Sequence, residues 1–130
     1  MWRKPNPTLA RARVRAALSM LLALFATTLA HAHAHLAHAT PAASSVVHNM
    51  PESVELSFSE AVEPVFSSIE VVDSTGGHLE EGKPTPDARD TKILKIEIKL
   101  TEPGVYKVLW RVLSVDTHRS SGDFTFTVAP

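Results

Sequence analysis

The sequence contains no cysteine among its 130 residues, which excludes a disulfide scaffold and thiolate metal sites. It is also poor in aromatic residues, at 6% of the chain, and in methionine, of which there are three. Met1 and Met20 lie in the N-terminal 32 residues, so Met50 is the one thioether left for the rest of the chain. Convincing helical periodicity is lacking after residue 32. The fold must therefore depend on an ordinary hydrophobic core built from strands.

The first 32 residues differ from the rest in charge and hydropathy. They carry five basic residues and no acidic one, and residues 16–30 are nearly all apolar. This apolar run is shorter than the about 20 residues that a membrane-spanning helix needs. A basic start, a short apolar core and the small residues of Ala30-His31-Ala32 together indicate a secretory signal. We therefore expect a cleaved signal peptide over 1–32 and a periplasmic protein, with an uncleaved anchor as the alternative.

The position of signal cleavage decides which residue begins the mature protein. The pattern of small residues permits a cut before His31, His33 or His35. Each cut leaves a histidine at the N-terminus, where one residue offers both a free amine and an imidazole. No internal histidine can supply that chelating pair.

The mature part of the chain is acidic. Of the 13 basic and 14 acidic residues, eight basic and all 14 acidic ones lie in residues 33–130, a net charge of −6 with histidine neutral. Such a domain lacks the basic patches that nucleic-acid binding requires, and it suits a cationic ligand. We expect neither nucleic-acid binding nor direct membrane insertion of this domain.

Alternation of apolar and polar residues predicts β-strands over most of the mature chain. Polar segments at 80–90 and 114–122 are predicted to be loops. The expected strands are 54–58, 66–73, 94–100, 105–113 and 124–128, with another near Leu36 and a hairpin closed by Gly76-Gly77 into His78-Leu79. Short strands at this spacing indicate an all-β sandwich or barrel of about seven strands.

Two aromatic residues of the 105–113 strand have expected structural roles. Tyr106 follows the Pro103-Gly104 turn, which is the arrangement of a tyrosine corner, although a plain cross-strand aromatic fits equally well. Trp110 lies on the same face of the strand and is expected in the core.

Two polar motifs carry the chemistry. Four of the seven histidines lie within residues 31–38, directly behind the apolar run. Asp116 and His118 stand two apart in a predicted loop, so both side chains can face one ion. Nitrogen and oxygen donors of this kind favour Cu(II), although zinc would accept them in tetrahedral geometry.

Several ordered motifs span nearly all of the mature chain. They are His33-Ala34-His35-Leu36 with Thr40-Pro41-Ala42, Leu56-Ser57-Phe58-Ser59-Glu60, residues 64–69, residues 103–111, residues 114–118, Gly122, and residues 124–128. In these motifs the chain resembles the periplasmic CopC-type copper-resistance proteins. The resemblance implies an immunoglobulin-like Greek-key β-sandwich or barrel that binds Cu(II) through its N-terminal histidine and an Asp-x-His loop.

Carried over residue by residue, the resemblance implies His33, Asp116 and His118 as metal ligands. The family has a leucine three residues after its first histidine, and Leu36 therefore selects His33 as the mature N-terminus. Glu60 would lie near the metal, or else it is an exposed carboxylate at a strand end. A local chelate of amine, two amide nitrogens and the His35 ring competes with this arrangement.

The resemblance implies a non-catalytic Cu(II) carrier or buffer in copper homeostasis or resistance. It also implies an inner-membrane partner of the CopD type. One departure concerns the methionine-rich Cu(I) loop of some relatives, which Met50 alone cannot supply. Two alternatives are a copper histidine-brace enzyme similar to polysaccharide monooxygenases and a metal-free adhesion or chaperone-like sandwich. His38, His48 and His78 are expected to be solvent-exposed.

Overall fold

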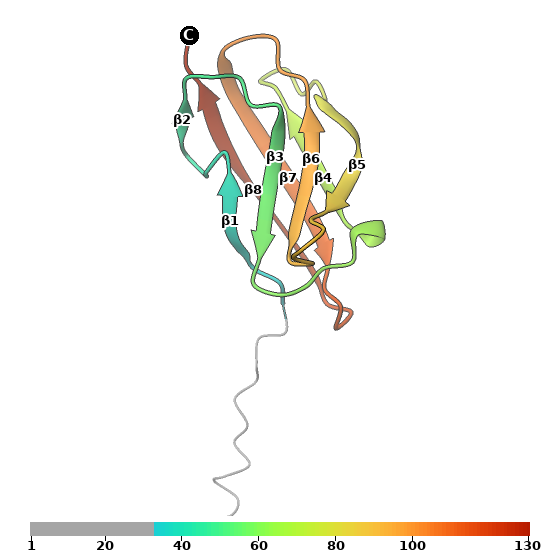
Figure 1. Cartoon of the computed structure of the whole chain (residues 1–130). Coiled ribbons are helices and arrows are strands. Elements are labelled where there is room, and N and C mark those ends of the chain that lie inside the picture. The colour runs from blue at the N-terminus through green and yellow to red at the C-terminus, as the bar shows by residue number, and fades with distance from the viewer. Residues whose placement is uncertain (1–32) are drawn as a thin grey trace, which may run out of the picture. The chain divides into compact units, whose positions relative to one another are not determined.

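The computed structural model describes residues 33–130, so the predicted signal peptide and its cleavage site lie outside the described residues. The described chain forms two four-stranded sheets that face each other (Figure 1). Its elements are β1 (Leu36–Thr40), β2 (Val46–Val47), β3 (Ser53–Phe58), the 3-10 turn η1 (Pro64–Phe66), β4 (Ser68–Val72), β5 (Glu80–Pro86), β6 (Ile93–Ile98), β7 (Gly104–Leu113) and β8 (Arg119–Val128). The prediction of an all-β sandwich is confirmed, with eight strands rather than about seven.

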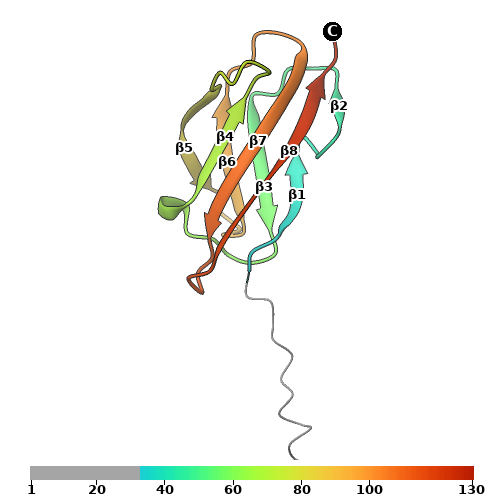
Figure 2. The same ribbon diagram turned by 180° about the vertical axis from the view of Figure 1, so that it is seen from behind.

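The order of strands places distant parts of the chain side by side. One sheet has the order β1-β3-β6-β5 and the other β2-β8-β7-β4. All strand pairs are antiparallel except β2 with β8, which is parallel. Seen from behind in Figure 2, β7 and β8 form a long antiparallel hairpin, and the turn between them lies at the end of the domain where β1 begins. This arrangement brings the start of the domain close to that turn.

The core consists of the inward-facing residues of both sheets, as the period-two pattern predicts. In β6, Leu94, Ile96 and Ile98 are buried while Lys95 and Glu97 point outward. Burying one such aliphatic side chain contributes about 1.5–3 kcal/mol, so the alternation itself determines which face packs inward. The other buried residues of the strands are Val54, Leu56, Phe58, Ile69, Val71, Tyr106, Val108, Trp110, Val112, Phe126 and Val128.

Trp110 lies in the core as expected and is 8% exposed. Its ring packs edge-on against Phe58, with ring centroids 5.3 Å apart. On the partner strand stands Gly122, where an added Cβ would lie only 2.6 Å from the indole Cζ2. The indole thus occupies the space that any larger residue at this position would need.

The prediction of a loop over 80–90 is wrong for its first part, because β5 spans Glu80–Pro86. This strand is at the edge of its sheet, where prolines are tolerated because one side needs no hydrogen bonds. Its pairing with β6 shifts register between Glu81 and Thr85, and Gly82 there has a φ of +75°. An irregular, charged edge strand of this kind carries no clear alternation.

Other boundaries also moved. The strand expected over 66–73 is β4, preceded by η1, and the 114–122 loop ends earlier because β8 begins at Arg119. The predicted hairpin across Gly76-Gly77 is reduced to a single bridge between Val72 and His78. Beyond this bridge the chain crosses to the other sheet, where β5 pairs with β6. Within residues 33–130 no helix is long and apolar enough to cross a membrane.

The tyrosine corner is present. The hydroxyl of Tyr106 donates a hydrogen bond to the carbonyl oxygen of Glu102, and its ring stacks on Phe126 at 5.7 Å between centroids. Tyr106→Phe removes the hydroxyl but keeps the ring, so we expect the free energy of unfolding to fall by about 1 kcal/mol. Urea denaturation followed by circular dichroism measures this. An unchanged midpoint would mean that the hydrogen bond contributes nothing to stability.

Candidate metal centre

The N-terminal arm, residues 33–35, precedes β1 and is attached to the segment that follows β3. The His35 N–H donates to Ser59 Oγ at 2.8 Å, and the Ser59 N–H donates to the His35 carbonyl oxygen at 2.8 Å. Between the two exposed histidines, the side chain of Ala34 is completely buried. These contacts fix the direction of the arm and leave His33 and His35 on its solvent side.

The turn of residues 114–118 joins β7 to β8 and carries the Asp-x-His motif. Ser114 is buried, its N–H donates to the His118 carbonyl oxygen at 2.9 Å, and its Oγ accepts from the His118 N–H at 3.3 Å. The Thr117 N–H donates to the Ser114 carbonyl oxygen at 2.9 Å. Thr117 has a φ of +72°, a conformation that is unfavourable for a β-branched residue. The turn therefore holds some backbone strain beside the exposed Asp116 and His118 side chains.

The arm and the turn meet at one end of the domain (Figures 1 and 2). The ring centroids of His33 and His118 are 5.1 Å apart, with an angle of 81° between the ring planes. Both residues are exposed, so neither ring is locked by packing. Two imidazoles at this separation, from segments far apart in sequence, can turn toward a common ion without movement of the sheets.

The other predicted site residues lie in the same two segments or directly beside them. Asp116 is exposed and shares the turn with His118, whereas His35 is exposed on the arm. Glu60 is half-buried and follows Ser59. In the described part of the chain, no three His, Asp or Glu side chains already converge as a preformed metal cluster. The two-histidine contact is thus the part of the predicted ligand set that the structure brings together.

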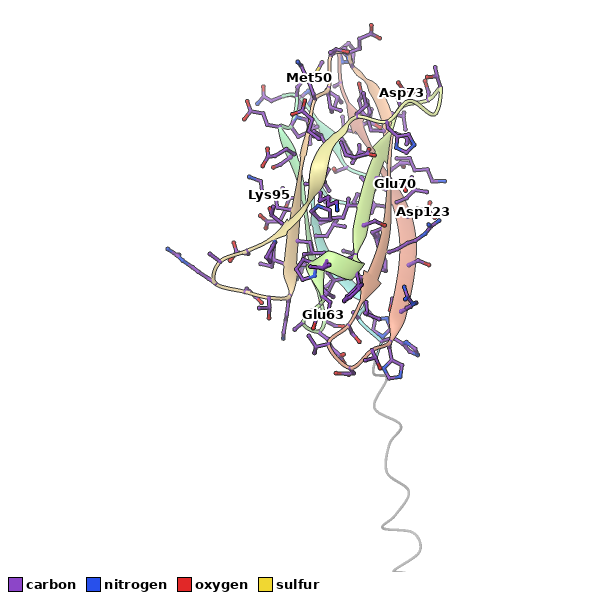
Figure 3. The ribbon with its side chains drawn as sticks, turned by 90° about the vertical axis from the view of Figure 1, so that its right-hand side faces the viewer. Met50, Glu63, Glu70, Asp73, Lys95 and Asp123 are labelled. Atoms are coloured by element: carbon purple, nitrogen blue, oxygen red, sulfur yellow. The ribbon has the colours of Figure 1, made fainter. Side chains whose placement is uncertain are left out.

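The remaining described histidines are exposed, as predicted, and His78 also has a partner. Its Nδ1 lies 2.8 Å from Glu80 Oε1. Burial raises the pKa of Glu80, but hydrogen bonds from the N–H of Val71 and its own N–H, together with His78, hold it below the usual range. The Thr75 hydroxyl and the N–H groups of Gly77 and Thr75 lower the pKa of Asp73 in the same region. The Glu63 N–H donates to the carbonyl oxygen of Leu113, which directly precedes the His118 turn. Figure 3 places Asp73 far from Glu63, so this cluster is not part of the histidine contact.

Sequence reasoning did not find the role of Ser59. Its hydroxyl is bonded to a residue 24 positions away, and nothing in the local pattern predicts that contact. In the sequence, Ser59 belongs to the Leu56-Ser57-Phe58-Ser59-Glu60 motif, which indicated the family resemblance and no contact with His35. Its two hydrogen bonds with His35 attach the arm to the segment that follows β3.

A family model described as the CopC domain matches residues 36–129. Protein YobA of Escherichia coli strain K12 is 40% identical over 119 residues, which are 88% of this chain and 94% of YobA. The crystal structure of CopC from Methylosinus trichosporium OB3b superposes with a TM-score of 0.71 at 37% identity, covering 75% of this chain and 95% of that one. PcoC, a methionine-rich copper resistance protein from E. coli, superposes with a TM-score of 0.65 at 33% identity, covering 75% and 99%.

Proposed function

Because this chain belongs to the CopC family, we propose that it binds one Cu(II) ion in the periplasm and carries or buffers it, without catalysing a reaction. The observation that carries this proposal is the contact between His33 and His118, rings of two separate segments at 5.1 Å. Copper is cargo in this account, held in reversible form. The solved relative PcoC is described as a copper resistance protein, which supports a role in copper handling.

The proposed ligands are the amine and ring of His33, the ring of His118 and a carboxylate oxygen of Asp116. Signal cleavage before His33 is part of the proposal, because the amine exists only on the first residue. Imidazole, amine and carboxylate are suitable Cu(II) donors, and the exposure of all three residues leaves room for them to adjust. Glu60, half-buried beside the arm, is proposed as an outer partner or weak ligand.

The bonds of the arm disfavour the competing chelate through His35. That chelate needs deprotonated amide nitrogens at residues 34 and 35. The His35 N–H, however, is donated to Ser59 Oγ, and loss of its proton would break this bond. The carbonyl of the same residue is held by the Ser59 N–H. Copper binding across the arm and the turn keeps both bonds, whereas the local chelate must break one of them.

Ser59→Ala tests the importance of this attachment. Without the hydroxyl, the His35 N–H loses its partner, and His33 is less often in position beside His118. We expect Cu(II) affinity to fall by up to about tenfold, which is the lower part of the range for residues that orient metal ligands. Competition titration with a Cu(II) chelator measures the change, and Ser57→Ala on β3 is the matched control. Equal affinities of the two variants would show that the hydroxyl has no positioning role.

The oxidation state and pH of binding follow from the ligand set. Protons compete with copper for imidazole and amine nitrogen, so affinity should decrease from about pH 8 to about pH 5. Cu(I) is a softer ion that prefers sulfur, and the described domain offers only Met50. We expect one Cu(II) per chain, released by acid or by reduction in the presence of a Cu(I) chelator. Cu(I) bound as tightly as Cu(II), or binding indifferent to pH, would contradict the assignment.

The partner remains part of the proposal. A carrier needs an acceptor, and the resemblance implies an inner-membrane protein of the CopD type. Copper transfer from the loaded protein to membranes that contain such a protein, compared with membranes that lack it, would test this directly.

A further inference from the structure

A small pocket lies on the outer face of the β2-β8-β7-β4 sheet, near the turn that carries His118. Its cavity volume is about 230 Å³. The lining residues come from η1, β7 and β8: Phe66, Arg111, Val112, Arg119, Ser120 and Ser121. Arg111 pairs across the strands with Ser121, and Arg119 lies two residues before Ser121 on the same face. Two guanidinium groups therefore border one pocket.

Neither arginine forms an ion pair with another described residue. The ion pairs within residues 33–130 join His78 to Glu80, Lys95 to Glu97 and Lys107 to Asp123, and none involves Arg111 or Arg119. Lys107 is on the same strand and the same face as Arg111, yet it is paired. This leaves two free positive charges together in a domain whose net charge is −6.

One edge of the pocket is formed by an exposed aromatic residue. Phe66 is 63% exposed and the adjacent Val65 is 86% exposed, although both belong to the short turn that packs beside β7. Exposed apolar groups next to free arginines are typical of surfaces that bind another protein, where arginine and aromatic residues are enriched. An isolated inorganic anion would not need the exposed aromatic edge.

We propose that this pocket docks an acidic segment of a partner protein, with a side-chain carboxylate between Arg111 and Arg119 and an apolar side chain against Phe66. The planar fork of a guanidinium matches a carboxylate in two parallel hydrogen bonds. The net negative charge of the domain repels such a segment and the two unpaired arginines attract it, so charge favours docking at this pocket. Nucleic acid is disfavoured, since two cations are too few against a net negative domain.

The place of the pocket suggests what the partner does. Arg119 directly follows His118, so a bound segment would lie beside the proposed copper ligands. An acceptor docked there would be positioned to receive the ion. This role rests on the proposed function, whereas docking itself does not require copper and can be tested on metal-free protein.

The test uses a short capped peptide with two glutamates flanking a phenylalanine, titrated into isotope-labelled, metal-free protein and followed by NMR. We expect saturable shifts of the backbone signals of Phe66, Arg111, Arg119 and Ser121, with a dissociation constant on the order of 1 mM. Arg111→Gln and Arg119→Gln should each weaken binding by about tenfold. Lys107→Gln removes the same charge from the same face and should change the affinity for the peptide by less than about twofold.

Three results would overturn the proposal. One is the lack of a preference for the acidic peptide, seen either as equal binding of the counterpart peptide in which glutamines replace both glutamates or as no saturation by either peptide. Another is an equal loss in Lys107→Gln, which would mean diffuse attraction rather than a pocket. The third is displacement of the bound peptide by inorganic phosphate at the concentration at which additional peptide would displace it. The pocket would then be a general anion site.

Discussion

Replacement of His118 with alanine is expected to weaken Cu(II) binding by more than about 100-fold, because even residues that only orient a ligand contribute about 10–100-fold. The variant loses one of the two imidazoles whose rings lie 5.1 Å apart. Its fold should be unaffected, since the side chain is exposed and the turn is held by backbone groups and Ser114. Competition titration with a Cu(II) chelator measures the affinity, and thermal unfolding of metal-free protein verifies the fold.

Two further variants make this result specific. His48→Ala removes an exposed histidine outside the arm and the turn, and it should bind copper like the parent. Asp116→Asn keeps one oxygen in place and should weaken binding less than His118→Ala does. If His118→Ala and Asp116→Asn both titrate like the parent, the turn is not part of the site and the chelate through His35 is favoured.

A single alanine added before His33 is expected to weaken Cu(II) binding by a comparable factor, about 10–100-fold or more. The extension moves the amine away from the imidazole, so the chelating pair on one residue is lost although every side chain remains. Intact mass spectrometry must first establish where the exported chain begins. A mature protein that begins at Ala34 or His35, or that keeps residues 1–32, would contradict the assignment of His33 before any titration.

The control for this extension is an alanine added after Pro130, which changes length and mass equally but leaves the amine in place. The prediction is a large loss for the N-terminal addition and none for the C-terminal one. An N-terminal extension that binds as tightly as the parent would mean that the amine is not a ligand.

The sequence predicted the strands whose pattern is strong and missed two others, the two-residue β2 and the edge strand β5. In β6 and β7, alternation is regular because one face packs into the core and the other meets solvent. In β5, an edge position, two prolines and a shift of register erase that signal, and the strand exists through its pairing with β6. Edge strands depend on their neighbours more than on their own residues.

The candidate site divides in a similar way. Residue types and the family resemblance singled out His33 and His118, and the fold does bring their rings together. Their role as ligands stays a prediction. The hydrogen bonds between His35 and Ser59, by contrast, required three-dimensional structure, because contacts across strands depend on register rather than on local sequence. The arginine pocket likewise arises from the pairing of β7 with β8.

If one Cu(II) is held between the N-terminal residue and the β7–β8 turn, two histidine rings should bind it. Pulsed electron paramagnetic resonance of the copper-loaded protein tests this arrangement most directly, because the remote ring nitrogens of bound histidines can be counted. We expect two bound imidazoles in the parent and in His35→Ala, and one in His118→Ala. One imidazole fewer in His35→Ala, together with an unchanged spectrum for His118→Ala, would contradict this arrangement and assign the copper to the local chelate on the arm.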